Sequence, residues 1–349
     1  MNPLPKTVLC LAIVTALCLV GPDATQAREP TVWYVSTTGS DNNSGISLET
    51  PFATLNRALE TARPGDTIRI RPGTYAEALV LEKLGQDHGE PIVIEGQPGL
   101  DPPVFDGQGV HAIGLWCEDC ANLTIRHLVF TGYTDLAVGF TQSTRITLEN
   151  ISARDNGCCV QLTDWEFEGY GLFLENSTDC LVKDCETSGN GPKPQGELLM
   201  GTGINMYGCA DSRILDNVSH HNIGGGILVE DSFNILVQGN TVYANDLDAS
   251  IDGWWDGGLW LDGGGNVVVR DNLFYSNLGP GLEISNEDNQ NIQGYVVEGN
   301  VCHSNYWGVY IWGFGTGELP GEDILVLRNN DFSGNEQGEI VVSPYDSVP

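Results

Sequence analysis

The sequence predicts an all-β fold, a single-stranded right-handed parallel β-helix, and two repeated patterns carry this prediction. The first is a short strand that opens with a small residue, nearly always glycine, and then alternates apolar positions; these Gly strands begin at residues 114, 137, 171, 203, 226, 258, 281, 308 and 338. The second is an asparagine followed five residues later by another, at 217/222, 240/245, 272/277, 300/305 and 330/335. The shortest full turn has 23 residues, which fits three short strands and three turns.

The paired asparagines have a structural explanation. Stacked asparagine side chains at a turn hydrogen-bond to their copies in the coils above and below, and so replace backbone partners that the bend removes. We therefore assign them no catalytic role. Propellers and sandwiches predict longer blades or Asn-Gly hairpins, and neither matches this spacing.

Residues 1–27 are interpreted as a secretory signal peptide. Lys6 is followed by an apolar run over residues 8–20, which is too short to span a bilayer, and cleavage after Ala27 fits the preference for small residues. No later stretch is long enough to cross a membrane. We expect a protein secreted to the extracellular space or the periplasm.

The segment 28–110 has a different pattern and is predicted to be the N-terminal cap and first coils of the same domain as 111–349. Strands are expected over 31–36 and 67–71. Between them, Thr50 and Pro51 predict the start of an amphipathic helix that runs to Ala62, with a hydroxyl N-cap and proline at the first helical position. A helix at this end would shield the first coil from edge pairing.

Five short motifs in this segment carry a family resemblance. They are WYVS at 33–36, GSD at 39–41, PFATL at 51–55, PGDT at 64–67 and RPGTY at 71–75. Together they resemble the N-terminal motif of extracellular pectate-lyase-like β-helix proteins. Members of that superfamily include polysaccharide lyases, glycoside hydrolases and uronate epimerases, so the resemblance implies the fold and a carbohydrate substrate rather than one reaction.

Composition narrows the class of partner. The 349 residues include 47 acidic and 15 basic side chains, a formal charge of −32. Such a charge repels phosphate backbones and anionic membranes, so we expect neither a nucleic-acid nor a membrane partner, and we expect a monomer. Eight cysteines follow residue 27, and they are expected to be core thiols or to form one or two disulfides. The spacing of Cys117 and Cys120 alone is weak support for zinc.

Three long insertions indicate where a ligand binds. Residues 157–170, 191–202 and 246–257 all precede Gly strands, so they should leave one corner of the helix and wall the face that the Gly strands form. Strand alternation sends the residues two and four after each glycine outward. The first outward column is Trp116, Gly139, Phe173, Asn205, Leu228, Trp260, Glu283 and Tyr310, and the second is Glu118, Thr141, Glu175, Tyr207, Glu230, Asp262, Ser285 and Trp312.

Aromatic rings and acids on one exposed wall suit the C–H faces and hydroxyls of a glycan. The alternative is that Trp116, Phe173 and Leu228 pack beneath the inserted loops. The predicted substrate-binding residues are Trp260, Tyr207, Phe173, Tyr310, Trp312, Glu175, Asn205, Trp254, Trp255 and Lys193.

The acids on this wall suggest glycoside hydrolysis, which needs two carboxyl groups across the scissile bond. Glu230, Asp262 and Glu283 lie on three successive coils about 4.8 Å apart. We assign Asp262 as nucleophile or base and Glu283 as general acid, with Glu230 in support, and this chemistry requires no cofactor. The alternative is a solvated acidic face without catalytic function.

Two other functions remain open. A polysaccharide lyase or uronate epimerase needs a base and a neutralised uronate, for which Lys193 and a calcium ion would serve; Asp246, Asp248, Asp252 and Asp256 are candidate calcium ligands. Their spacing matches no known calcium loop. The third function is a glycan-binding surface protein that uses the aromatic residues alone and catalyses nothing.

Overall fold

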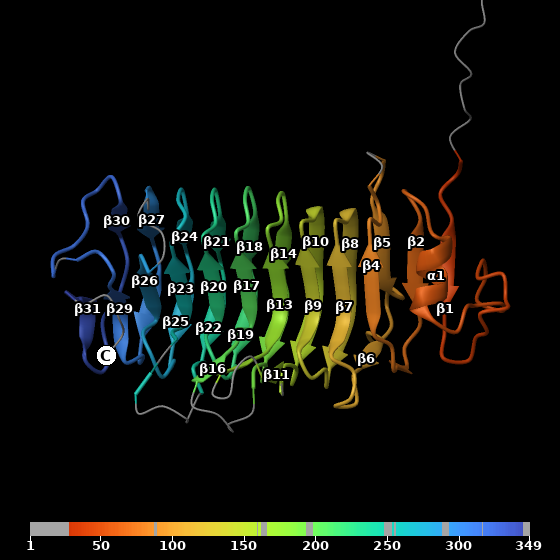
Figure 1. Ribbon diagram of the computed structural model, residues 1–349, viewed down its shortest axis with the longest axis horizontal. Coiled ribbons are helices and arrows are strands. Elements are labelled where there is room, and N and C mark those ends of the chain that lie inside the picture. The colour runs from red at the N-terminus through yellow and green to blue at the C-terminus, as the bar shows by residue number, and fades with distance from the viewer. Residues whose placement is uncertain are drawn as a thin grey trace, which may run out of the picture.

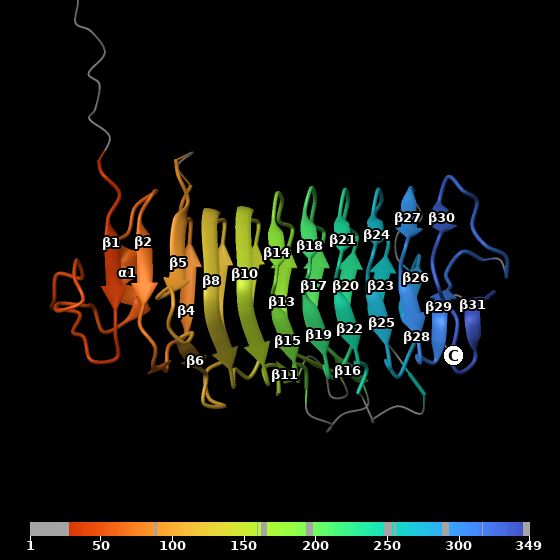
Figure 2. The same cartoon turned by 180° about the vertical axis from the view of Figure 1, so that it is seen from behind.

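The computed structural model describes residues 28–344 except 87–88, 159, 162–165, 193–197, 248–252, 255, 288–292 and 316. Its coils stack into one elongated column, with the N-terminal helix at one end and the last strands at the other (Figures 1 and 2). The strands in this column are almost all parallel, which confirms the predicted β-helix. No helix in the described ranges is long and apolar enough to cross a membrane.

The N-terminal end consists of β1 (Val32–Val35), α1 (Leu55–Thr61) and β2 (Thr67–Ile70). The helix is shorter than predicted, and its N-cap is Thr54 rather than Thr50. The reason is that Phe52 pairs with β1 instead: its amide donates to the carbonyl of Tyr34, and its carbonyl accepts from Ser36. The predicted capping of the column by a helix is confirmed, with Leu55, Ala58 and Leu59 buried against it.

The nine Gly strands and the preceding strand β4 form one ten-stranded parallel sheet along the column. Its strands are β4 (Leu79–Glu82), β7 (Ile113–Glu118), β9 (Leu136–Thr141), β13 (Tyr170–Glu175), β17 (Ile204–Tyr207), β20 (Ile227–Glu230), β23 (Leu259–Asp262), β26 (Leu282–Ser285), β29 (Trp307–Ile311) and β31 (Gly338–Val342).

The other two sides of the coil belong to an 18-stranded sheet, because the long strands β8 (Ala121–Thr131) and β10 (Thr144–Arg154) bend around the corner and join both sides. One side holds β1, β2, β5 (Ile92–Gly96), β14 (Leu181–Lys183), β18 (Arg213–Leu215), β21 (Leu236–Gln238), β24 (Val268–Arg270), β27 (Tyr295–Glu298) and β30 (Leu325–Arg328). The other holds β3 (Thr74–Tyr75), β6 (Val104–Asp106), β15 (Glu186–Ser188), β19 (Val218–His220), β22 (Thr241–Tyr243), β25 (Leu273–Tyr275) and β28 (Val301–His303). A small third sheet contains β11 (Val160–Gln161), β12 (Glu166–Glu168) and β16 (Leu198–Met200).

The repeated asparagines form two continuous ladders, as predicted. In one ladder the amide of Asn240 donates to Oδ1 of Asn272 over 2.9 Å, and the amide of Asn272 donates to Oδ1 of Asn300 over 3.0 Å. The second ladder repeats this arrangement from Asn156 through 190, 222, 245, 277 and 305 to 335. Each buried turn amide thus has a side-chain acceptor in the next coil.

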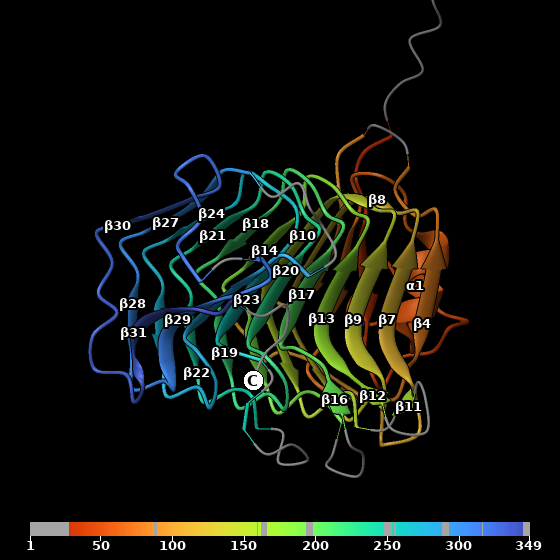
Figure 3. The same ribbon diagram turned by 60° about the vertical axis from the view of Figure 1, so that its left-hand side comes forward.

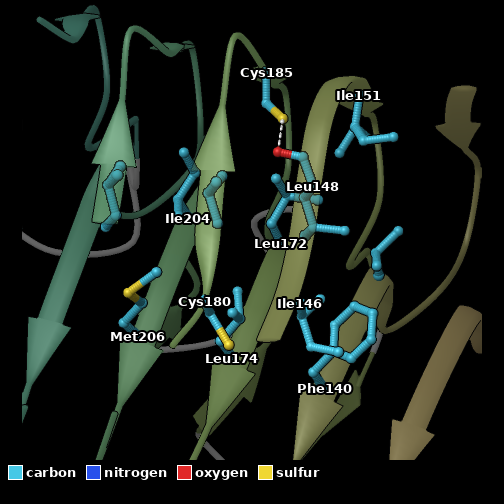
Figure 4. Packing of buried hydrophobic residues seen from close by; sticks show 14 of the residues in the cluster. Phe140, Ile146, Leu148, Ile151, Leu172, Leu174, Cys180, Cys185, Ile204 and Met206 are labelled. Carbon is cyan, nitrogen blue, oxygen red and sulfur yellow. Dashed lines mark hydrogen bonds between the residues drawn. The ribbon is translucent and has the colours of Figure 1, made fainter. Parts of the chain in front are cut away.

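The interior of the column is a continuous apolar core whose members come from all three sides of each coil (Figure 4). Six cysteines lie buried in it as free thiols: 117, 120, 180, 185, 209 and 302. The thiol of Cys185 lies 3.6 Å from the carbonyl oxygen of Leu148 (Figure 4). Cys158 is disulfide-bonded. Most of the described cysteines are therefore core thiols, which was one of the two predicted alternatives.

Candidate active site on the Gly-strand face

Strand register confirms both predicted outward columns along the Gly-strand sheet. In the first column Leu228 pairs with Trp260, Trp260 with Glu283, and Glu283 with Tyr310. In the second, Tyr207 pairs with Glu230 and Glu230 with Asp262. Side chains distant in the sequence thus gather on one flank, because each coil adds one strand in register.

The three insertions leave one corner of the column, also as predicted. Where they rejoin the Gly strands, glycines stack so closely that a Cβ on Gly201 would lie 2.0 Å from the carbonyl oxygen of Gly169, and one on Gly224 would lie 2.1 Å from that of Gly201. Asp256 occupies the next position of this stack. Figure 3 shows β11, β12 and β16, which belong to the first two insertions, together at this end of the Gly strands.

Glu283 is the most buried acid of the face, with none of its surface exposed. Trp312 donates its indole N–H to Oε1 of Glu283 over 2.7 Å, while Oε2 has no hydrogen-bond donor among the described residues. Burial raises the pKa of Glu283 well above its ordinary value; the Trp312 bond opposes this, and the carboxylates of Asp256, Asp246 and Asp262 add to it. Its surroundings therefore favour the protonated form of Glu283.

Asp262 lies on the strand beside Glu283 and is 5 % exposed. Its Oδ1 accepts from Ser285 Oγ at 2.5 Å and from the amide of Glu287 at 3.0 Å, and Ser285 Oγ in turn accepts from the indole of Trp260 at 2.7 Å. Since Asp262 pairs with Ser285, it is the diagonal neighbour of Glu283, at a Cα separation of roughly 7–8 Å. The two acids are on adjacent strands of one face but in different columns.

Two further acids lie at the corner beside this pair. Asp256 is nearly fully buried; its Oδ2 accepts from the amide of Gly225 over 3.0 Å. A Cβ on Gly224 would lie 2.7 Å from the same oxygen, so only glycine permits this close approach. Asp246 is also buried, and its Oδ1 lies 3.4 Å from the amide of Asp256. We call Asp246, Asp256, Asp262 and Glu283 the buried acid cluster.

The aromatic residues at this end are buried too. Trp254, Tyr310 and Trp312 form a small core of their own, against which Trp260 packs, half-buried. Trp254 and Tyr310 meet edge-to-face with their ring centroids 4.8 Å apart. The prediction of a solvent-facing wall is therefore wrong from Asp262 onward, because Tyr310 and Trp312 are buried and pack with Trp254 of the third insertion.

The middle of the face is more open. Tyr207 is 37 % exposed, and Phe173, Glu175, Leu228 and Glu230 are half-buried. Asn205, between Phe173 and Leu228 in the first column, is buried. These residues lie in register along the sheet, so they line a path that leads to the buried acid cluster.

A second group of acids lies farther toward the N-terminus and was missed from the sequence. Asp135 and Glu168 line a pocket of about 260 Å³ with Trp116, Phe173 and Tyr170. Burial and the nearby Glu168 raise the pKa of Asp135 to about 6. Burial also raises the pKa of Glu168, against a 3.3 Å hydrogen bond from the hydroxyl of Tyr170. Neither acid belongs to the alternation of a Gly strand: Asp135 directly precedes β9, and Glu168 ends β12, two residues before β13 begins.

No group of three or more histidine, cysteine, aspartate or glutamate residues within the described ranges is arranged to hold a metal ion. Of the predicted calcium ligands, Asp246 and Asp256 lie close together, while Asp248 and Asp252 are outside the described residues, as are Lys193 and Trp255. A calcium site therefore stays a prediction. Cys117 and Cys120 are buried free thiols rather than part of such a group.

Comparison with known proteins places this geometry in a family. A family model described as "Pel9A-like, right handed beta helix region" matches residues 33–245, and one described as "Right handed beta helix region" matches residues 247–348. Pectate lyase L of Dickeya chrysanthemi is 23 % identical, over 87 % of this chain and 72 % of its own length.

Two solved structures share the fold. Pectate lyase Pel9A superposes with a TM-score of 0.62 at 15 % identity, over 90 % of this chain and 80 % of that chain. A GH136 lacto-N-biosidase from Eubacterium ramulus superposes with a TM-score of 0.52 at 14 % identity, over 90 % of this chain and 68 % of that chain. The same architecture thus occurs in proteins named as a lyase and as a glycosidase, and the reaction has to be argued from the site.

Proposed function

This chain belongs to the Pel9A-like right-handed β-helix family, and from that premise we propose that it is a polysaccharide-cleaving glycoside hydrolase in which Glu283 donates the proton and Asp262 is the partner carboxylate. The observation that carries the proposal is Glu283 itself: a fully buried carboxyl beside Trp312, with Asp262 on the adjacent strand. Desolvation against an indole is a known way to keep a catalytic acid protonated at neutral pH.

The two roles follow from the environments of the two acids. Glu283 carries a proton that it can give to the oxygen of the leaving sugar. Asp262 is oriented by Ser285 and by the backbone amide of Glu287. Inverting enzymes hold their two carboxyl groups about 6.5–9.5 Å apart to leave room for a water molecule, against about 5 Å in retaining enzymes, and we propose the inverting arrangement because Asp262 and Glu283 lie in different columns. Asp262 would then take a proton from a water molecule whose oxygen attacks the anomeric carbon, while the glycosidic bond breaks.

The open middle of the face supplies sugar contacts. Tyr207, Leu228 and half-buried Trp260 offer ring and aliphatic surface for the C–H faces of a sugar, and Glu175 and Glu230 offer acceptors for its hydroxyls. Because Glu283 is covered in the structure, a substrate has to displace part of that cover before the proton can be transferred.

A polysaccharide panel tests the reaction. Purified protein is incubated with neutral and uronate-containing polysaccharides, and reducing ends and ultraviolet absorbance of unsaturated products are both recorded. Hydrolysis gives new reducing ends without absorbance, and Glu283→Gln abolishes it. Binding without any product would instead support the glycan-binding alternative. Recovery of the chain from the culture medium with its N-terminus at residue 28 tests the predicted export.

A calcium-dependent lyase is the second candidate, and the observation that favours it is the close approach of two buried acids, Asp246 and Asp256, which are two of the four predicted calcium ligands. Buried carboxylates are commonly paired or bound to a metal ion, and calcium takes oxygen ligands. The relative named pectate lyase L adds to this candidate. In this reaction the cation would neutralise a uronate, with Lys193 as the candidate base. Absorbance that grows on pectate only with calcium, and that Lys193→Ala abolishes, would decide in favour of the lyase.

A further inference from the structure

The pocket around Asp135 and Glu168 is set apart from the strand of Glu283, although its lining residue Tyr170 is within electrostatic reach of Asp256. It opens at β9 and β13, and three strands, β17, β20 and β23, separate β13 from the strand of Glu283. Four strand spacings correspond to about 19 Å along the column. The pocket therefore is not part of the proposed cleavage site, yet it lies on the same face and in the same columns.

Aromatic and aliphatic side chains form most of the pocket. Trp116 and Phe173 stand on either side of Gly139 in the first column, and Val80, Ile113 and Leu136 complete the apolar lining. Phe173 also meets Tyr170, with ring centroids 4.9 Å apart and planes inclined by 44°. These surfaces are of the kind that packs against the C–H face of a sugar ring.

Gly139 gives the pocket its shape. A Cβ at this position would lie 2.5 Å from Cε3 and 2.6 Å from Cζ3 of Trp116, so the indole lies directly over the glycine. Any side chain here would push the indole away from its place. The aromatic wall between Trp116 and Phe173 thus depends on a residue without a side chain, in a column where most other positions carry large ones.

Two carboxylic acids converge on this apolar lining, and no lysine, arginine or histidine accompanies them among the described lining residues. The side chains that shift the pKa values of this pair are an acid and a phenol: Glu168 raises the pKa of Asp135, and the hydrogen bond from Tyr170 lowers that of Glu168. The carboxylates of Glu230 and Asp256 in turn raise the pKa of Tyr170. A uronate or sulfated sugar would be repelled here, since nothing in the lining neutralises its charge. The hydroxyls of an uncharged sugar can hydrogen-bond to both carboxyl groups.

We propose that this pocket is a binding subsite for an uncharged sugar residue of the polysaccharide, about four strands from the cleavage site, with Trp116 and Phe173 as its walls and Asp135 and Glu168 as its hydroxyl partners. The inference rests on the proposed function only in taking the Gly-strand face as the polysaccharide groove. It adds a substrate class, a chain that carries a neutral sugar at this distance from the bond that is cleaved.

Calorimetric titration of the full chain carrying Glu283→Gln tests the subsite without cleavage. The probes are uncharged tetrasaccharides of glucose, galactose, mannose and xylose, with tetragalacturonate as the anionic comparison. We expect at least one uncharged probe to bind. Phe173→Ala should weaken that binding at least tenfold, and Gly139→Val should do so through the displaced indole. Phe233→Ala, which removes an exposed phenylalanine from another turn, is the matched control.

The acids have a separate, isosteric test. Asp135→Asn together with Glu168→Gln keeps the shape of the pocket and removes its charge, so binding of tetragalacturonate should rise at least threefold relative to the uncharged probe; Asp179→Asn, on an exposed turn, is the control. The proposal is overturned if no uncharged probe binds, or if Phe173→Ala and Gly139→Val leave binding unchanged. Cleavage by the wild-type chain is assayed independently, so its absence would count against the proposed function and not against the subsite.

Discussion

The two acid groups of the Gly-strand face differ in how far each is removed from water. Glu283 is buried against Trp312, and Asp262 is buried against Ser285 and the amide of Glu287, whereas Asp135 and Glu168 are half-buried in the lining of a pocket. Both groups lie at the same side of the same sheet, so strand register does not distinguish them. The inserted loops do, because Trp254 and Asp256 belong to the insertion that covers the C-terminal group. Burial raises the pKa of acids in both groups, and the more complete burial of Glu283 favours its protonated form more strongly.

The largest effect is expected from Glu283→Gln. General acid catalysis typically contributes about 10²–10⁴-fold, so turnover should fall by that amount while substrate affinity changes little. The same change removes a buried carboxyl, so thermal stability at pH 8 should rise above that of the wild-type chain. Turnover and melting temperature are measured together, with exposed Glu322→Gln as the control. Unchanged turnover would remove Glu283 from the mechanism.

Loss of a hydrogen bond should lower the free energy of unfolding more at buried Glu283 than at half-buried Glu168. Trp312→Phe removes the donor to Glu283, and a buried acceptor left without a donor costs about 1–3 kcal/mol. Tyr170→Phe removes the donor to half-buried Glu168, which water can replace, so the loss should stay below about 1 kcal/mol. Urea denaturation measures both. Equal losses would mean that the two groups are solvated alike.

The two acid groups should also differ in the pH range over which they affect the stability of the fold. The folded pKa of Asp135, about 6, lies above its ordinary value of 3.8. The folded chain thus binds the proton more tightly than the unfolded chain, and this contribution to stability, complete below about pH 4, is lost as the pH rises through 6. Asp135→Asn should therefore melt higher than the wild-type chain above pH 6, with the difference vanishing at pH 4.

For Glu283 the corresponding loss of stability should extend to a higher pH, because full burial disfavours the charged form of a carboxyl more strongly than the half-burial of Asp135 does. Melting curves of Asp135→Asn and Glu283→Gln from pH 4 to pH 9 give both windows. If both variants gained stability over the same pH range, the two acids would not differ in burial as the structure indicates.

The smallest effect is expected from removing calcium. A hydrolase that works with Glu283 and Asp262 needs no cation, so EDTA should leave the rate of reducing-end formation within about twofold of its value in calcium. Loss of activity in EDTA, restored by calcium, would favour the lyase candidate and give the buried acid cluster a metal-binding role.

The sequence by itself determined the column, its cap, both asparagine ladders and the membership of each outward column, because these depend on local spacing: strand alternation has a period of two, and one coil repeats in 23 residues at the shortest. It missed the start of α1, since Phe52 gains a pairing partner in β1 that is distant in sequence. It also missed Asp135, which directly precedes β9, and Glu168, which ends β12, because neither belongs to the alternation of a Gly strand.

What only the tertiary structure decided is solvation. Nothing in the spacing around Asp262 and Glu283 distinguishes them from Glu175 or Glu230, and the difference arises from which insertion folds over which coil. How deeply Glu283 is buried depends on which other segments of the chain cover it, and burial in turn favours its protonated form. Local sequence can place a carboxyl on a face, but the desolvation that sets its chemistry comes from parts of the chain far away along the sequence.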